Sequence, residues 1–190
     1  MNKIILASQS PRRKQLLEWA EIPFEIGVNE SDEFYPPGLH PDEIAIYIAR
    51  KKALAVQDIT TQGRVILAAD TIVVLNEAVL GKPVHREEAV SMLFALSGSK
   101  HNVITGVVIR KDDKEIAFAD STEVTFHKLT IEQIEFYVDK YKPYDKAGAY
   151  AIQEWIGVVG IKSIKGDFYN VMGLPVSRVV REIDKFLLEN

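Results

Sequence analysis

An aspartate stands in the middle of the most apolar stretch of this chain. Residues 65–69 (VILAA) form a continuous apolar run that is typical of a strand buried on both faces of a sheet. Asp70 interrupts the run, which resumes with Thr71 and the β-branched residues 72–74. Burying an unpaired carboxylate is costly, so Asp70 must meet a cation, a metal ion or hydrogen-bond donors, or lie at a strand end that faces a cleft. Taken alone, an aspartate that caps a turn explains the pattern equally well.

Strands and helices are expected to alternate along the chain. Apolar runs predict strands, besides the central stretch, at Lys3–Ala7, Phe24–Val28, His101–Arg110, Glu115–Phe126 and around Val158–Ile164. Helical spacing predicts helices from Pro11 to about Ala20, at Asp42–Gln57 and Arg86–Leu96, from Thr130 to about Tyr141, and at Pro175–Leu188. Ser10 is a good N-cap, and Thr130 with Gln133 forms a capping box. The pattern indicates an α/β protein, and 190 residues suffice for one domain or two small lobes.

The composition excludes several classes of protein. A formal net charge of −4 and a pI near 5.6 argue against a protein that holds nucleic acid by bulk electrostatics. The absence of cysteine excludes disulfides, thiolate metal sites and a cysteine nucleophile, and it fits a reducing compartment. No run approaches the roughly 20 apolar residues of a membrane span, and the N-terminal apolar run is too short for a signal peptide. We therefore expect a cytoplasmic protein that forms no stable complex with nucleic acid or membrane.

Two arginines follow the turn at which the first helix is expected to begin. In the stretch from Ser8 to Arg13 (SQSPRR), free backbone donors and the helix dipole favour an anion, and guanidinium groups make bidentate phosphate contacts. Because cations at a helix start oppose the dipole, Arg12 and Arg13 are better explained by an anionic ligand than by helix stability. The alternative is that both arginines are simply exposed.

Acidic residues and lysines supply a second set of candidates. Glu30, Asp32 and Glu33, together with Asp70, offer the oxygen ligands that a hard cation such as Mg²⁺ selects, although acidic loops are often only solvated. Lysines are available at positions 52 and 82. A phosphate cradle combined with acidic metal ligands is what phosphoryl transfer requires. No Walker A, G-x-G-x-x-G, H-E-x-x-H or G-x-S-x-G motif is present.

Eight short motifs follow one another along the chain. They are SQSPRR at 8–13, Asp32-Glu33, ARKKA at 49–53, AADTIV at 68–73, GKP at 81–83, SGSKH and ITG within 97–106, YDKAGAYAIQ at 144–153 and NVMGLP at 170–175. Together they resemble the Maf family of nucleoside triphosphate pyrophosphatases. The resemblance implies a single Maf-like domain over residues 1–190, with a long, twisted mixed sheet flanked by helices and two lobes around a nucleotide cleft, similar to the inosine triphosphate pyrophosphatases. It also implies hydrolysis of a nucleoside triphosphate to the monophosphate and pyrophosphate.

The resemblance implies roles for individual residues as well. Asp70 takes the place of the family's proton acceptor, and Glu33 that of a metal-organising carboxylate for a divalent cation, Mg²⁺ or Mn²⁺. Phosphate contacts are expected from Ser8, Arg13, Lys52 and Lys82. Asp70 could instead act chiefly as a metal ligand, because an ordinary aspartate is a weak base. A homodimer is the family's usual arrangement, whereas its association with septum formation does not follow from these residues.

Three positions separate two branches of the family. A 7-methyl-GTP branch has Trp, Gln and Glu where this chain has Arg12, Thr71 and Gln153. Trp can stack on the methylated purine and Glu can accept the two N–H donors of guanine, whereas the amide of Gln153 offers one donor and one acceptor to the O4 and N3–H of uracil or thymine. The chain therefore resembles the dTTP and UTP branch, with modified pyrimidine nucleotides as further candidates. The alternatives are a 7-methyl-GTP pyrophosphatase or a non-catalytic nucleotide-binding regulator linked to cell division.

Overall fold

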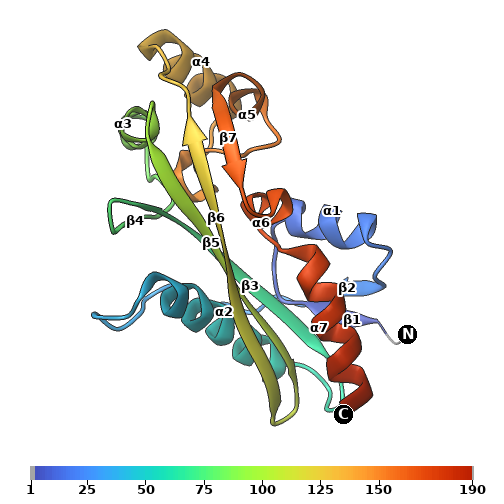
Figure 1. Ribbon diagram of the computed structural model, residues 1–190. Coiled ribbons are helices and arrows are strands. Elements are labelled where there is room, and N and C mark those ends of the chain that lie inside the picture. The colour runs from blue at the N-terminus through green and yellow to red at the C-terminus, as the bar shows by residue number, and fades with distance from the viewer. Residues whose placement is uncertain (1–2, 190) are drawn as a thin grey trace. The chain divides into compact units, whose positions relative to one another are not determined.

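The structure is a computed structural model that describes residues 3–189. Seven strands form a mixed sheet in the order β2-β1-β3-β5-β6-β7, with β4 paired to β3 (Figure 1). The strands are β1 (Ile4–Leu6), β2 (Phe24–Ile26), β3 (Ile66–Leu75), β4 (Ala78–Leu80), β5 (Lys100–Lys111), β6 (Lys114–Phe126) and β7 (Ile161–Lys165). The helices are α1 (Pro11–Trp19), α2 (Pro41–Gln57), α3 (Arg86–Leu96), α4 (Ile131–Tyr141), α5 (Trp155–Gly160), α6 (Phe168–Met172) and α7 (Val176–Glu189), with a 3₁₀ turn, η1, at Ala147–Ala149.

The described chain divides into two compact units. Unit 1 contains the chain up to Thr71, the stretch Thr105–Asp120, and the chain from Gly173 onward. Unit 2 contains Ile72–Ile104 and Ser121–Met172. None of the helices within residues 3–189 is long and apolar enough to cross a membrane.

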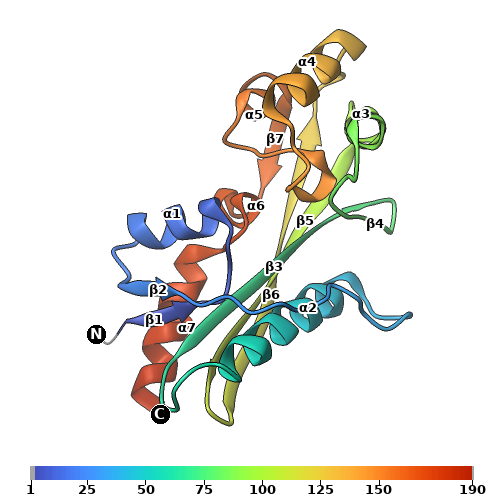
Figure 2. The same ribbon diagram turned by 180° about the vertical axis from the view of Figure 1, so that it is seen from behind.

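Unit 1 is built around parallel strands. Strand β1 pairs in parallel with β2 on one side and with β3 on the other, with Ile5 opposite Ile66. Parallel neighbours need crossover connections, which α1 and α2 provide, and the right-handed rule places these two helices on opposite faces. Figures 1 and 2 show α2 on one face and α7 on the other. The apolar side of α2 packs on the sheet through Ala49, Ala53 and Val56.

Helix α2 approaches strand β5 without any gap. A Cβ atom added to Gly106 of β5 would stand 2.3 to 2.5 Å from backbone atoms of Ala45 and Ile46 in α2. Such separations are far shorter than van der Waals contact distances. Only glycine therefore fits at position 106 while α2 lies this close to β5. The close approach sets the depth at which α2, and with it Lys52, lies against the sheet.

Unit 2 combines antiparallel pairs with a helical layer. The end of β3 turns back into β4, with Val73 opposite Leu80, and β6 pairs with β7, with Val124 opposite Ile164. Helix α3 contacts both α4 and η1. A ring cluster forms where Phe126 and Tyr150 meet edge to face at 5.0 Å and His101 meets both rings.

Most of the expected elements are confirmed, and the differences have physical causes. The strand expected from Val158 is wrong in its first part, because residues 155–160 form α5 and the strand begins only at Ile161. Two β-branched valines suggested a strand there, yet the backbone N–H of Val158 donates to the carbonyl of Glu154, and Val158 is 81% exposed. The pattern also missed β4 and α6, which have three and five residues. Ser10 is the N-cap of α1, but its side chain makes no capping hydrogen bond.

Candidate active site

Asp70 lies within strand β3, not at a strand end, and the residue is only 7% exposed. Its Oδ1 atom accepts a hydrogen bond from the ammonium of Lys52 at 2.5 Å. The same ammonium donates to Oε1 of Glu33 at 3.1 Å. Lys52 comes from α2 and Glu33 from the segment before that helix, so both carboxylates meet at one cation. Of the alternatives that the sequence left open for Asp70, the structure shows a cationic partner in the middle of a strand.

Arg13 lies on the buried side of α1 and is 8% exposed. Its guanidinium donates through Nε to the carbonyl of Gly173 at 2.8 Å, through Nη1 to the hydroxyl of Ser8 at 3.2 Å, and through Nη2 to the hydroxyl of Thr71 at 2.9 Å. Burial lowers the pKa of Arg13 below its ordinary value, and the negative charge of Asp70 opposes this effect. Arg13 therefore links three segments of unit 1, which contain Ser8, Thr71 and Gly173, by hydrogen bonds. It keeps its positive charge next to Asp70.

Two groups near Arg13 had no assigned role in the sequence. Thr105 of β5 is fully buried, and its hydroxyl lies 2.9 Å from that of Thr71. The carbonyl of Gly173 accepts from Arg13 and, at 3.4 Å, from Thr71. Both residues fall within motifs quoted above, ITG and NVMGLP, but no residue pattern indicates that they contact Arg13. Only the fold brings them there.

The acidic segment before α2 is tied to that helix by neighbouring ion pairs. Asp32 accepts from Lys51, beside the pair between Glu33 and Lys52. The hydrogen bond from Lys51 holds the pKa of the exposed Asp32 carboxyl below its ordinary value. Glu33 thus joins the site at Asp70, whereas Asp32 is engaged by the adjacent lysine.

The remaining predicted residues lie on three segments of the chain. Arg12 is half-buried on α1 in unit 1. Lys82 is exposed in the segment between β4 and α3, and Gln153 is exposed in the turn before α5; both belong to unit 2. Unit 1 thus brings together Ser8, Arg13, Glu33, Lys52, Asp70 and Thr71.

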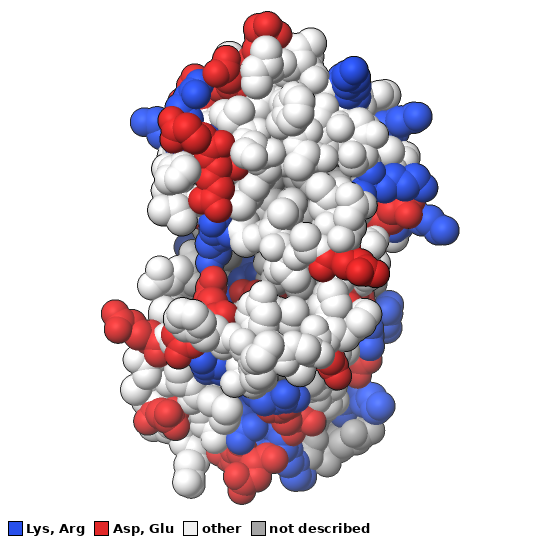
Figure 3. Space-filling view, turned by 90° about the vertical axis from the view of Figure 1, so that its left-hand side faces the viewer, with Lys and Arg blue, Asp and Glu red and all other residues white. Residues whose placement is uncertain are grey.

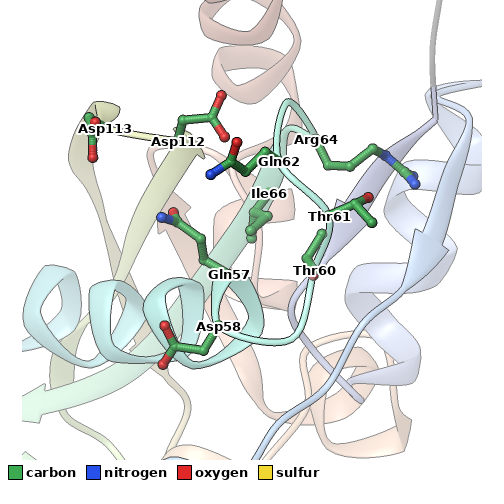
Figure 4. A pocket seen from close by; sticks show the side chains of 9 residues that line it. All are labelled: Gln57, Asp58, Thr60, Thr61, Gln62, Arg64, Ile66, Asp112 and Asp113. Atoms are coloured by element: carbon green, nitrogen blue, oxygen red, sulfur yellow. The ribbon is translucent and has the colours of Figure 1, made fainter.

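A cavity of about 280 Å³ lies elsewhere in unit 1 (Figure 4). Its walls are the end of α2, the segment after it, the first residue of β3 and the turn between β5 and β6, and they comprise Gln57, Asp58, Thr60, Thr61, Gln62, Arg64, Ile66, Asp112 and Asp113. Arg64 points away from the other lining side chains and pairs with Glu25 at 2.5 Å, while Asp112 accepts from the backbone of Gly63. None of the predicted site residues lines this cavity.

The charged side chains are mixed over the face drawn in Figure 3. Lysine and arginine lie among aspartate and glutamate, and neither sign covers a broad continuous area there.

The chain belongs to the Maf-like protein family, whose model matches residues 3–186. It is similar to a dTTP/UTP pyrophosphatase from Parabacteroides distasonis, with 51% identity over 97% of this chain and 96% of that relative. A dTTP/UTP pyrophosphatase from Cytophaga hutchinsonii is 53% identical over 96% of this chain and 83% of its own length. Among solved structures, a HAM1 protein from Coxiella burnetii aligns with 19% identity and a TM-score of 0.45 over 66% of this chain and 73% of that one.

Proposed function

We propose that this protein is a nucleoside triphosphate pyrophosphatase that hydrolyses dTTP and UTP to the nucleoside monophosphate and pyrophosphate. The observation that carries the proposal is the similarity, at 46% to 53% identity over at least 95% of this chain, to relatives named dTTP/UTP pyrophosphatase. The buried Asp70, held by Lys52 beside Glu33, supports the same conclusion because phosphoryl transfer needs a positioned carboxylate among cations.

In the proposed reaction a water molecule attacks the α-phosphorus. The oxygen of the water forms the new bond to phosphorus, the bond from the α-phosphorus to the bridging oxygen breaks, and pyrophosphate leaves with that oxygen. Asp70 accepts the proton of the attacking water through its carboxylate. Lys52 orients that carboxylate by its hydrogen bond to Oδ1.

We assign the phosphate contacts to Ser8, Arg13, Lys52 and Lys82. In unit 1, Ser8 and Arg13 stand at the start of α1, where backbone donors favour an anion. The hydroxyl of Ser8 accepts from Arg13 and from the backbone N–H of Ser10, so its own proton remains available to a phosphate oxygen. For Arg13, the three protein hydrogen bonds support a role in bracing the site as well as in charge compensation.

A divalent cation, Mg²⁺ or Mn²⁺, is part of the proposal. The described residues hold no cluster of three or more histidine, aspartate or glutamate side chains that could bind a metal by themselves. Glu33 and Asp70, however, share the ammonium of Lys52, and two carboxylates completed by substrate phosphates and water make an ordinary Mg²⁺ site. We therefore assign the cation to Glu33 and Asp70. When bound, it would neutralise charge on the phosphate oxygens.

The choice of pyrimidine rests on Arg12, Thr71 and Gln153. We assign Gln153 to the pairing edge of the base, where its amide matches the O4 and N3–H of uracil and thymine. The hydroxyl of Thr71, held between Arg13 and Thr105, leaves this position small and polar. A homodimer and a cytoplasmic location complete the proposal, and sedimentation of the pure protein tests the first.

The deciding experiment is product analysis with the pure protein. We expect UTP and dTTP, incubated with Mg²⁺ in ¹⁸O-labelled water, to give pyrophosphate and a labelled monophosphate, and GTP and 7-methyl-GTP to react far more slowly. Label found in pyrophosphate would reject attack at the α-phosphorus. Binding of UTP without formation of any product would instead favour a non-catalytic nucleotide-binding regulator.

A further inference from the structure

Gln153 is exposed in a turn, residues 150–154, that is hydrogen-bonded to a buried hydroxyl group. Tyr137 of α4 is fully buried, and its hydroxyl accepts a hydrogen bond from the backbone N–H of Ala151 at 3.2 Å. The same hydroxyl donates to the carboxylate of Glu154. Tyr137 thus forms hydrogen bonds to the turn before and after Gln153, with the backbone of residue 151 and with the side chain of residue 154.

A buried lysine completes this attachment. Lys146 is 7% exposed, and its ammonium lies 3.5 Å from Oε1 of Glu154 and 2.8 Å from Oδ1 of Asp145. Removing a lysine from water carries a large desolvation cost that an apolar side chain would avoid. Lys146 pairs with Oε1 of Glu154 while Tyr137 donates to Oε2, so the carboxylate next to Gln153 has two partners.

The backbone that joins Lys146 to the turn is strained. Gly148 and Ala149 have φ values of +66° and +62°, and the left-handed region costs an alanine roughly 1–2 kcal/mol. Val73 fills the space where a Cβ of Gly148 would lie, at 2.9 Å, and the N–H of Gly148 donates to the carbonyl of Gly81 at 3.0 Å. Surroundings that hold a strained backbone in place are typical of functional segments.

This segment also connects to the other candidate substrate residue of unit 2. Gly81, which accepts from Gly148, immediately precedes Lys82. At the start of the turn, the hydroxyl of Tyr150 lies 2.7 Å from Nε2 of the buried His101. Residues 146–154 are therefore fixed at both ends and in the middle, and Gln153 is the most exposed residue of the turn 150–154.

We propose that Tyr137, together with Glu154 and Lys146, forms a positioning cluster that fixes the turn carrying Gln153 and so determines how strictly the enzyme reads the base. The inference rests on the proposed function, in which Gln153 contacts the pyrimidine edge. A hydrogen-bonding group discriminates between bases only when its backbone is held to within about 0.5 Å. None of the three cluster residues needs to touch the substrate.

A double-mutant cycle tests whether Tyr137 acts through Gln153. Tyr137→Phe removes only the hydroxyl, and we expect kcat/KM for UTP to fall about tenfold, mainly through KM, because the N–H of Ala151 loses its contact with that hydroxyl and the carboxylate of Glu154 loses one of its two partners. In a Gln153→Ala background the same change should cost less than twofold, since the group it positions is gone. Tyr141→Phe is the control: Tyr141 stacks on Tyr137 in the same helix, and its loss of a hydroxyl should leave kcat/KM unchanged.

The outcomes distinguish a failure of the positioning role of Tyr137 from a failure of the proposed function. If the parent does not hydrolyse UTP, or Gln153→Ala leaves kcat/KM unchanged, the proposed function or its base contact fails, and the inference fails with it. If Gln153→Ala lowers kcat/KM but Tyr137→Phe lowers it equally in both backgrounds, Tyr137 is only structural. Should Tyr137→Phe not fold, as judged by its thermal unfolding, Glu154→Gln enters the same cycle with the same expectation.

Discussion

The ammonium of Lys52 lies 2.5 Å from Oδ1 of Asp70, so a helix lysine neutralises the carboxylate in the middle of strand β3. The same ammonium reaches Glu33. The pair explains how an apolar strand tolerates a charge, and it makes Lys52 an orienting group for Asp70 even before any phosphate is present.

Replacing Asp70 should remove catalysis and leave the fold. Asp70→Asn keeps the size of the side chain but cannot accept the proton of the attacking water, so we expect kcat for UTP to fall by about 10²–10⁴-fold. Pyrophosphate release measures the loss, and thermal unfolding with nucleotide binding checks the fold. Asp32→Asn is the control, since Asp32 pairs with the neighbouring Lys51 and should be dispensable. Loss of folding in Asp70→Asn would mean that Asp70 is structural.

Removing Lys52 should cost stability. Lys52→Met leaves the buried Asp70 without its cation, and we expect the free energy of unfolding to fall by roughly 1–3 kcal/mol in urea titrations at pH 7. Lys51→Met breaks the neighbouring ion pair with Asp32, whose side chain is 59% exposed, and should lower the free energy of unfolding much less than Lys52→Met does. Equal losses in both variants would show that burial of the Asp70 pair does not matter.

Changing Gln153 should alter the choice of base. Gln153→Glu places a second acceptor opposite O4 of the pyrimidine, which should lower kcat/KM for UTP and dTTP by roughly tenfold to a hundredfold. Adding Arg12→Trp supplies a stacking face and should shift preference toward 7-methyl-GTP. Steady-state kinetics over the nucleotide panel measure both effects. Unchanged hydrolysis of UTP by Gln153→Glu would remove the physical support for a pyrimidine contact at this position.

His101 should make the protein sensitive to acid. Burial lowers the pKa of His101 from 6.5 to about 4, so the unfolded chain takes up this proton first as the pH falls. The stability that the neutral ring contributes is complete above pH 6.5 and is lost as the pH falls toward 4, a loss of about 2 kcal/mol between pH 7 and 4.5. Urea titrations at the two pH values should therefore show a smaller loss for His101→Asn than for the parent. The exposed His127, changed to Asn, should leave the parent's loss unaltered.

Gly106 should tolerate no side chain. Gly106→Ala would drive a methyl group into the backbone of α2, so we expect the free energy of unfolding to fall by about 3 kcal/mol. Gly81→Ala, whose Cβ would meet no atom within 4 Å, should change it by less than about 0.5 kcal/mol. A neutral effect of Gly106→Ala in urea titrations would mean that α2 can move away from β5 at little cost.

Local signals predicted the elements that local physics determines. The capping box of Thr130 and Gln133 and the helix Arg86–Leu96 are confirmed because caps and helical spacing depend on neighbours in sequence. The α/β fold, the mixed sheet and the family are confirmed as well. The predicted strand at Val158 is partly wrong because the carbonyl of Glu154 accepts two N–H donors there and begins α5.

The sequence pattern did not predict contacts between residues that are far apart in the chain. Arg13 and Gly173 are 160 positions apart, and nothing in either motif indicates their hydrogen bond. The sequence suggested that Arg13 serves an anion, and the structure adds that the guanidinium also braces Ser8 and Thr71. The catalytic, metal-binding and substrate-binding roles assigned to all the site residues, Asp70 and Arg13 included, remain predictions.

Unit 1 is assembled from three separated stretches, and this has a consequence during synthesis on the ribosome. The carbonyl that receives Arg13 and the helix α7 belong to the stretch that begins at Gly173, about 100 residues after Thr71, which at 5–20 residues per second takes roughly 5–20 s to emerge. Until then Arg13 of the nascent chain lacks one of its hydrogen-bond acceptors, and helix α7 is not yet available to pack on the sheet. A ribosome that stalls before Gly173 should therefore present chaperones and proteases with an unfinished unit 1, even when the whole of unit 2 has already been made.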